Sequence, residues 1–405
     1  MDYTAHTSPP INTSRQFSAS PSLPSHVLSL CPTAATLFFL PSVYTILFLT
    51  AVPGNVLSLW VFLRRISTTS PTHVYLSHLS VSNLMLSLTT PFLAAYFACG
   101  SFWTLSSVLC QLVLHLITPV LHINIYIGLM ILTWVALSRF AALVQHTHAS
   151  KPNTCITLLP HSFFTRLKRV SFARKVCGAV WLLAVGGIVP VTVFYSVREV
   201  ISGDSTKTGE DIMCYNPAVE VGGGLSAACN VSAITVFFVC YLLVLLSYMS
   251  VLKHIWRSRR STNVITSQSL LGRVLRNIIV IQVVLSACLL PYHIYKPIFI
   301  SLAYQQSAHS PEPGTHCHPL STHVEVKNGL LLLAALRGST DPVMYFLLDK
   351  TFRQQTFRLL GFDQNAPVKK QPCWSVTGSL SPRPGQLGVG NEPTATMGSS
   401  RESVL

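Results

Sequence analysis

The sequence predicts an all-α fold, a seven-transmembrane helical bundle followed by an amphipathic helix. Seven apolar segments are each long enough to cross a bilayer core, which takes about 20 residues in a helix. Only 10% of the 405 residues are charged, whereas a soluble domain has about 25%. Acidic residues are absent between Asp2 and Glu199, although Lys and Arg occur there in tight groups. These observations indicate one compact membrane domain.

The apolar segments are placed by their length and by the basic residues at their ends. They cover residues 34–63, 73–98, 107–138, 175–197, 224–252, 272–303 and 327–348. Positive residues stay preferentially on the cytoplasmic side of a membrane. The basic groups at 64–65, 166–175 and 253–276 therefore predict cytoplasmic loops, and the acidic residues of the loop after Glu199 fall outside. The predicted topology is multi-pass in the plasma membrane, with the N-terminus extracellular and the C-terminus cytoplasmic.

The chain divides into four regions by composition. Residues 1–33 form an extracellular tail, 34–348 the membrane domain, 349–362 an amphipathic helix at the membrane surface, and 363–405 a disordered cytoplasmic tail. No basic start followed by an apolar run is visible, so no cleavable signal peptide is predicted. The sequon at Asn12 predicts N-glycosylation of the first tail.

Composition and spacing set aside several classes of function. The net charge of +15 is compatible with nucleic-acid binding, but the basic residues flank apolar segments and form no basic domain. A transporter or channel needs polar groups along a continuous path, and Arg337, Asp341, Asn83 and Asn124 are too few and too local. No nucleophile, base and orienting group recur at a useful spacing, so neither enzyme activity nor a cofactor is predicted.

Landmark residues occur in order along the segments. The last segment holds Asp341, Pro342 and Tyr345 within an apolar helix, and such features are costly in lipid and mark moving parts. The others are Gly54-Asn55, Asn83 with Pro91, Ser138-Arg139-Phe140, Trp181, Tyr248 and Cys288-Leu289-Leu290-Pro291-Tyr292. With these landmarks the chain resembles the rhodopsin-like G-protein-coupled receptors over about residues 34–362. Within that family, Leu290-Pro291-Tyr292-His293 and Asp341 are similar to the branch that contains nucleotide receptors.

The resemblance implies a mechanism and a partner. A ligand from outside shifts the bundle between two states, and the open cytoplasmic face then acts on a heterotrimeric G protein. The residues expected to act as the activation switch are Asn83, Ser138, Arg139, Tyr248, Pro291, Arg337, Asp341, Pro342 and Tyr345. Singly, each has a simpler explanation in helix packing. The alternative function is a receptor-fold membrane scaffold that does not itself activate G proteins.

Two disulfides are implied by the resemblance, Cys110 with Cys214 and Cys31 with Cys317. Cys110 lies about one helical turn further from Arg139 than in the family. We therefore expect the outer end of that helix to be extended or bulged near Pro119. As an alternative, Cys317 could bind zinc with His316, His318 and His323, but one thiol on a loop is a weak metal signal, and no metal site is predicted.

Three basic residues are expected to line the ligand pocket. His293 and Lys296 are three residues apart on one helix face, and Lys327 opens the last segment, so the three can converge on an anion. By resemblance, the ligand is a nucleotide or an acidic lipid. The alternative is that the lysines extend outward while His293 only packs, or that they meet Glu325 and the acidic second outer loop. Leu289 stands where the family commonly has an aromatic residue.

Two departures from the family concern signalling. Ser138 replaces the acid that usually restrains Arg139, which predicts ligand-free signalling; the alternative is that Ser138 and backbone carbonyls hold Arg139 adequately. Asn83 and Gly128 replace groups of the family's sodium site. Since Arg337 is four residues from Asp341, we expect those two to pair and sodium to have no effect.

The remaining predicted partners are membrane lipids and a PDZ-domain protein. Basic inner loops are attracted to anionic lipid. The chain ends Ser403-Val404-Leu405, which fits peptides that add a strand to a PDZ domain. Because motifs of this length are common, a chance match is the competing explanation.

Overall fold

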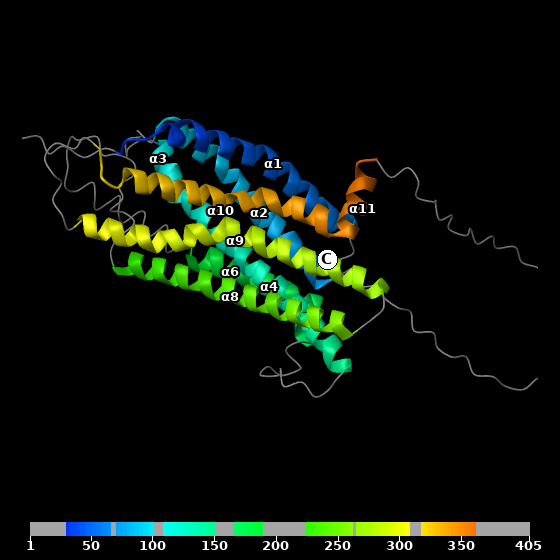
Figure 1. Cartoon of the computed structure of the whole chain (residues 1–405). Helices are drawn as coiled ribbons and strands as arrows, with labels where there is room; N and C mark the ends of the chain where they lie inside the picture. Colours follow the sequence, from blue (N-terminus) through cyan, green and yellow to red (C-terminus); the bar gives the residue numbers. More distant parts are fainter. Residues whose placement is uncertain are drawn as a thin grey trace, which may run out of the picture.

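Helices make up the regular secondary structure of the described part of the chain (Figure 1). The computed structural model describes residues 30–65, 70–100, 108–150, 165–188, 224–261, 265–307 and 317–361. Asn12, Cys214, His316 and the terminal Ser403–Leu405 lie outside these ranges. Within them, long helices lie side by side as a bundle, which confirms the predicted fold class.

Six of the described helices are long and apolar enough to cross a membrane. They contain α1 (Leu40–Trp60), α2 (Pro71–Ala98), α4 (Thr118–Ser150), α8 (Gly224–Ser261), α9 (Ile265–Ser307) and α10 (Ser321–Leu348). The remaining predicted segment begins with α6 (Val170–Leu183), which continues as a π-helical turn at Ala184–Ile188, where the described range ends. The short α11 (Lys350–Leu359) follows α10, in the region where an amphipathic helix is expected.

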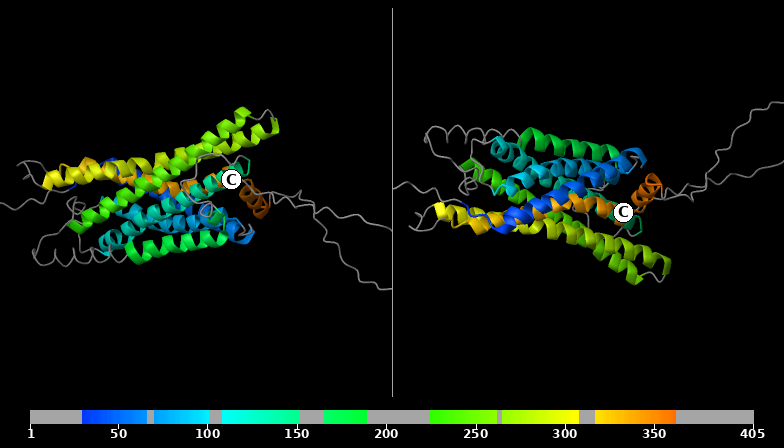
Figure 2. Two further views of the ribbon diagram at one scale, coloured as in Figure 1. Left: turned by 90° about the horizontal axis from the view of Figure 1, so that it is seen from below. Right: turned by 90° about the horizontal axis from the view of Figure 1, so that it is seen from above.

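Several helices are longer than the apolar segments predicted from the sequence. α9 has 43 residues and starts at Ile265 rather than at 272, and α10 starts at Ser321 rather than at 327. The difference arises because helical hydrogen bonding continues past the bilayer, whereas hydropathy marks only the part that lipid surrounds. Figure 2 shows the α8–α9 pair projecting at the end of the bundle where α11 lies.

The helix that carries Cys110 has an irregular turn at the predicted place. α3 (Val108–Leu112) passes into a π-helical turn at Val113–Ile117, and α4 begins at Thr118, just before Pro119. Proline lacks an N–H group and its ring clashes with the carbonyl four residues earlier, so a regular α-helical turn is unfavourable there. The wider π-turn avoids this clash, which confirms the expected bulge near Pro119.

The two ends of the bundle differ in chemistry. At one end a disulfide joins Cys31 to Cys317, with 5.5 Å between the Cα atoms; we call this the disulfide end. At the other end Arg139 lines a cavity together with Leu348, the last residue of α10; we call this the arginine end.

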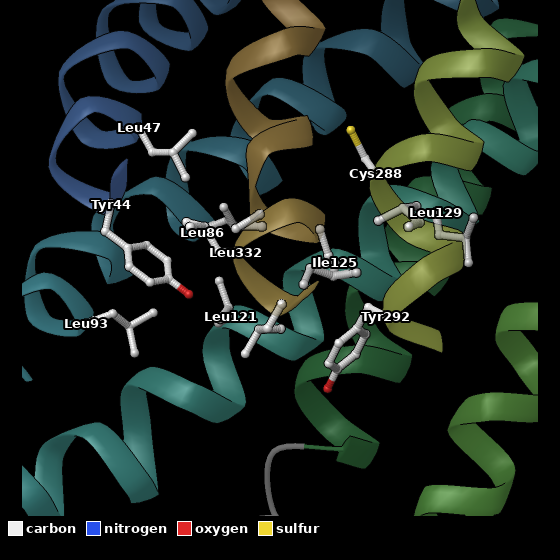
Figure 3. Packing of buried hydrophobic residues seen from close by; sticks show 14 of the residues in the cluster. Tyr44, Leu47, Leu86, Leu93, Leu121, Ile125, Leu129, Cys288, Tyr292 and Leu332 are labelled. Carbon is white, nitrogen blue, oxygen red and sulfur yellow. The ribbon is translucent and has the colours of Figure 1, made fainter. Parts of the chain in front are cut away.

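The hydrophobic core lies between the helices along the bundle axis. Figure 3 shows side chains from α1, α2, α4, α9 and α10 pointing into this space, among them Tyr44, Leu93, Leu121 and Leu332. Tyr44 also stacks on Phe97 of α2, with 5.9 Å between ring centroids. This packing fixes how α1, α2 and α4 lie relative to one another.

Large apolar side chains also cover the outer surface of the bundle. On α1, Ile46 and Leu49 are exposed, and on α8, Val231 and Leu246 are exposed. A soluble protein would bury such residues, whereas a lipid-facing helix surface presents them to the acyl chains. The exposed faces therefore agree with a chain that spans a membrane.

Candidate functional site

A buried polar cluster joins three helices at the middle of the bundle. We call Asn55 of α1, Asn83 of α2 and Arg337 and Asp341 of α10 the central cluster. Asn83 Nδ2 donates to Asp341 Oδ2 at 2.8 Å, and Arg337 Nη2 donates to Asn83 Oδ1 at 3.1 Å. Arg337 Nε lies 3.8 Å from Asp341 Oδ2, which is the ion pair expected from their spacing.

The central cluster reaches α1 through Asn55. Its amide nitrogen donates to the carbonyl of Gly338 at 2.7 Å, and Asn83 Nδ2 lies 3.3 Å from Asn55 Oδ1. Next to Asn55, a β-carbon on Gly54 would lie 3.1 Å from Pro342 Cβ. Glycine thus lets α1 approach α10 closely at the proline. The residues Gly54-Asn55 and Asp341-Pro342 therefore lie together where α1 contacts α10.

Gly128 on α4 makes room for the Arg337 side chain. A β-carbon at this position would overlap Arg337 Nη2 and would lie 2.7 Å from Cζ. Arg337 is only 2% exposed, so its guanidinium cannot move into solvent without leaving the bundle. A side chain larger than hydrogen at 128 would therefore require the Arg337 guanidinium to shift.

A cavity of about 50 Å³ lies between the central cluster and the arginine end. Its polar lining includes Arg139, Tyr248, Arg337, Asp341 and Tyr345. The Nη1 atoms of both arginines are buried and have no hydrogen-bond partner among the described residues. Arg139 and Tyr248 therefore line the same cavity as Asp341 and Tyr345 of α10.

Ser138 does not hold the neighbouring Arg139. Its hydroxyl donates to the backbone carbonyl of Val135 at 2.9 Å, within its own helix. No described residue forms an ion pair with Arg139. The structure therefore places no restraining carboxylate beside this arginine in the described part of the chain.

Tyr345 and the start of α11 form an aromatic group at the arginine end. Tyr345 meets Phe62 edge-on at 5.5 Å and Phe352 at 6.0 Å between ring centroids. Asp349 caps α11 by accepting hydrogen bonds from the backbone N–H groups of Thr351 at 2.8 Å and Phe352 at 3.0 Å. The cap fixes the sharp turn between α10 and α11.

At the disulfide end, the residues before α1 are tied to α10. The Glu325 carboxylate accepts hydrogen bonds from Thr33 and from the Thr36 hydroxyl, the latter at 2.6 Å. Glu325 therefore bonds to these threonines, not to the lysines that were its alternative partners. Cys110 is also disulfide-bonded, and its expected partner Cys214 lies outside the described residues.

The zinc alternative for this end loses its thiol ligand. The sulfur of Cys317 is in the disulfide, and His323 Nδ1 lies 2.8 Å from the Tyr295 hydroxyl. Burial lowers the pKa of His318, whose Nδ1 accepts a hydrogen bond from the backbone N–H of Leu320 at 3.1 Å. These histidines therefore have structural partners.

The three residues expected to bind an anion are all buried, but they have different neighbours. His293 is fully buried: its ring stacks on Phe237 of α8 with 3.6 Å between centroids, and its Nδ1 lies 2.8 Å from the Leu289 carbonyl oxygen. These contacts agree with the alternative in which His293 only packs against its neighbours. The Lys327 ammonium lies 4.9 Å from the centre of the Phe299 ring. Because Phe299 is one turn from Lys296 on α9, the two lysines lie near the same α9–α10 contact.

The sequence reasoning missed a polar contact between α4 and α9. His122 Nε2 lies 2.8 Å from the Tyr292 hydroxyl, next to the stacked His293 and Phe237 rings. This aromatic group lies beside Leu289, where the family commonly has an aromatic side chain. A histidine within an apolar segment was the available signal, but its partner on another helix could not be read from spacing.

Comparison with known proteins finds a matching protein family and several relatives of this chain. The model of the 7 transmembrane receptor (rhodopsin family) matches residues 54–345. Probable G-protein coupled receptor 82 of Homo sapiens is 35% identical over 339 residues, which cover 84% of this chain and 96% of the human protein. The Mus musculus protein of the same name is 34% identical over 330 residues, covering 81% and 96%.

A more distant relative has a ligand in its name. The uracil nucleotide/cysteinyl leukotriene receptor of Homo sapiens is 24% identical over 323 residues, covering 79% of this chain and 76% of that protein. The matched region runs from Gly54 beside Pro342 to Tyr345, and so includes every residue of the central cluster. This chain belongs to the rhodopsin family of seven-transmembrane receptors.

Proposed function

We propose that this receptor senses an extracellular ligand at its disulfide end and activates a heterotrimeric G protein at its arginine end. In this topology the N-terminus is extracellular and the C-terminus is cytoplasmic, in the plasma membrane. The observation that carries the coupling step is the state of Arg139, whose buried Nη1 has no hydrogen-bond partner among the described residues. A desolvated guanidinium group binds carbonyl or carboxylate oxygens of an inserted helix strongly.

The second part of the proposal is signalling without ligand. A carboxylate beside Arg139 would stabilise a resting state, and the Ser138 hydroxyl bonds to Val135 instead. Removing a restraint of a few kcal/mol populates the active state measurably when the two states are close in free energy. This supports a receptor with basal activity.

The third part concerns the ligand, which we propose to be anionic. Lys296 and Lys327 are only 8% and 7% exposed, and the Lys327 ammonium lies over the Phe299 ring of α9, the helix that carries Lys296. Two buried lysines on neighbouring helices, α9 and α10, can attract phosphate or carboxylate groups. A relative named for uracil nucleotides, which carry phosphate, supports this class of ligand. His293, fully buried and stacked on Phe237, is not part of this proposed anion site.

Nucleotide exchange in membranes tests the coupling step. Membranes that contain the full chain are mixed with a panel of purified G proteins, and exchange is compared with membranes lacking the receptor. We expect exchange without ligand, its loss in Arg139→Ala, and no loss in Arg276→Ala, which removes an exposed arginine of α9. If no G protein responds at equal surface expression, the scaffold alternative is favoured instead.

A panel of nucleotides and phosphate or carboxylate lipids tests the ligand class. For a compound that raises exchange, Lys296→Ala and Lys327→Ala should each lower its potency by roughly tenfold or more, because one charged hydrogen bond contributes about 1.5–3 kcal/mol. Lys296→Arg keeps the charge and serves as the matched control. Unchanged potency in both alanine variants would rule out the anion site.

The remaining partners are proposed from the sequence and from α11. On α11, Phe352 is buried against the bundle and Phe357 is exposed, which suits a helix lying on anionic lipid. Capture of a PDZ domain by Ser403–Leu405 should be abolished when one residue is appended after Leu405. Glycosylation at Asn12 should be visible as a mass shift on glycosidase treatment, absent in Asn12→Gln.

A further inference from the structure

Arg337 is among the largest fully buried side chains of the described chain. Its guanidinium lies between α2, α4 and α10, far from either end of α10. Through Nη2 it contacts Asn83, and through Nε it approaches Asp341. Burying a charge in this position costs free energy unless the charge is paired.

The space for the guanidinium comes from Gly128. A β-carbon there would overlap Nη2, so even alanine would displace the group. Glycine within a helix weakens the helix relative to alanine. The fit between Gly128 and Arg337 explains why a glycine is placed in the interior of α4.

The charges of the central cluster cancel. Asp341 provides one negative charge, Arg337 one positive charge, and Asn55 and Asn83 none. The Asp341 oxygen that accepts from Asn83 is also the one nearest to Arg337. Little negative potential is left for a mobile cation at this place.

We propose that Arg337 is a tethered cation: its guanidinium, seated over Gly128, permanently supplies the positive charge that neutralises Asp341 and links α2, α4 and α10. No mobile ion takes part in this arrangement. Arg337 acts as a positioning residue for the α10 helix that carries Pro342 and Tyr345. The inference goes beyond the proposed ligand and G-protein coupling and depends on neither.

The guanidinium group suits this task better than an ammonium group. Nη2 and Nε leave the planar group in different directions, so one side chain reaches both Asn83 and Asp341. Lysine presents a single point charge and is more strongly hydrated, so it cannot make both contacts in a dry site. We therefore expect Arg337→Lys to behave more like a neutral substitution than like the wild type.

Chemical rescue separates a tethered cation from a merely packed side chain. The full-length receptor and its Arg337→Ala variant are placed in lipid nanodiscs, and the apparent unfolding temperature is followed. The variant should unfold roughly 5 °C or more below wild type, because a buried charge has lost its partner. Millimolar guanidinium should recover part of this loss by binding in the vacated space, whereas urea, which has the same planar shape and no charge, should not.

Wild type and variant should also differ in their response to salts. The unfolding temperature of wild type should be equal in sodium and choline chloride at the same ionic strength, because the cation site is already filled. Equal effects of guanidinium and urea on a folded Arg337→Ala variant would overturn the proposal, and so would a sodium-dependent wild type. Neither readout requires a ligand or a G protein, so failure here is distinct from failure of the proposed function.

A double-mutant cycle tests the Gly128 contact independently. Gly128→Ala should destabilise the receptor about as much as Arg337→Ala, and the double variant should be no worse than either single one, since the same contact is removed. Gly178→Ala, on α6 with no atom within 4 Å of the added carbon, is the control and should be neutral. Additive losses would overturn the proposal. If Arg337→Ala does not fold, the cycle is run with Arg337→Gln, which keeps the side-chain bulk.

Discussion

The Glu325 carboxylate holds Thr33 at two points. One oxygen accepts from the Thr33 backbone N–H at 2.6 Å, and the other accepts from the Thr33 hydroxyl at 2.9 Å. Two residues earlier, Cys31 is joined to Cys317. The chain before α1 is thus attached near the start of α10 by a disulfide and by hydrogen bonds to a carboxylate. These links hold the first turns of α1 and α10 close together.

The first prediction concerns this attachment. Glu325→Gln should raise the hydrogen-exchange rate of the Thr33 amide about tenfold, because a bond to a charged acceptor contributes about 1.5–3 kcal/mol and the amide replaces only part of it. Ser42→Ala is the control, since the Ser42 hydroxyl bonds only within its own helix. Unchanged exchange at Thr33 would mean that the disulfide alone orders this segment.

The second prediction is a pH dependence at the disulfide end. Burial lowers the pKa of His318 below its ordinary 6.5, so the unfolded segment binds a proton more readily than the folded one. The stabilising contribution is therefore complete above pH 6.5 and is lost as the pH falls through the lowered pKa. Intrinsic-rate-corrected protection of the Leu320 amide, which donates to His318, should decrease below pH 6 or so. In His318→Asn the protection should be independent of pH.

The third prediction restores the missing acid. Ser138→Asp places a carboxylate beside Arg139, where Ser138 bonds only to its own helix. A pair worth about 1–2 kcal/mol should lower ligand-free nucleotide exchange roughly fivefold to thirtyfold. Ser138→Asn has the same size and no charge, and should leave exchange near the wild-type level. Equal basal exchange in both variants would show that a carboxylate at this position does not restrain Arg139.

The fourth prediction concerns the contact between α4 and α9. Tyr292→Phe removes the hydroxyl that lies 2.8 Å from His122 Nε2 and keeps the ring against His293. The loss of one buried hydrogen bond should lower the free energy of unfolding by about 1 kcal/mol. Tyr304→Phe, at an exposed position of α9, is the control. Leu289 stands where the family commonly has an aromatic residue. If the His122–Tyr292 bond transmits ligand binding instead of such a residue, Tyr292→Phe should lower agonist efficacy more than agonist potency.

Apolar length and basic flanks were sufficient to predict the fold, because both report directly on a helix in lipid. Local features were also predictable: Arg337 pairs with Asp341 because residues four apart share a helix face, and the bulge near Pro119 was expected from the extra helical turn between Cys110 and Arg139. Helix ends were predicted less well. α10 starts at Ser321 because its polar first turns satisfy helical bonding without being apolar.

Contacts between distant segments could not be predicted in the same way. Helical spacing placed His293 on the face of Lys296, but its depth depends on Phe237 of α8, whose position the spacing does not contain. Gly128 was recognised as unusual, yet its role became clear only with Arg337 packed against it. The site thus depends on which helices are neighbours, and the residue pattern within one helix does not determine its neighbours.

The π-turn at Val113–Ile117 divides one long helix into two lengths that can change independently. On one side lies the stretch that carries Cys110, and on the other lie Gly128 and Arg139. A widened turn can absorb an inserted residue without rotating the helix beyond it. A change of length in the stretch that carries Cys110 can therefore leave the register of Gly128 and Arg139 the same.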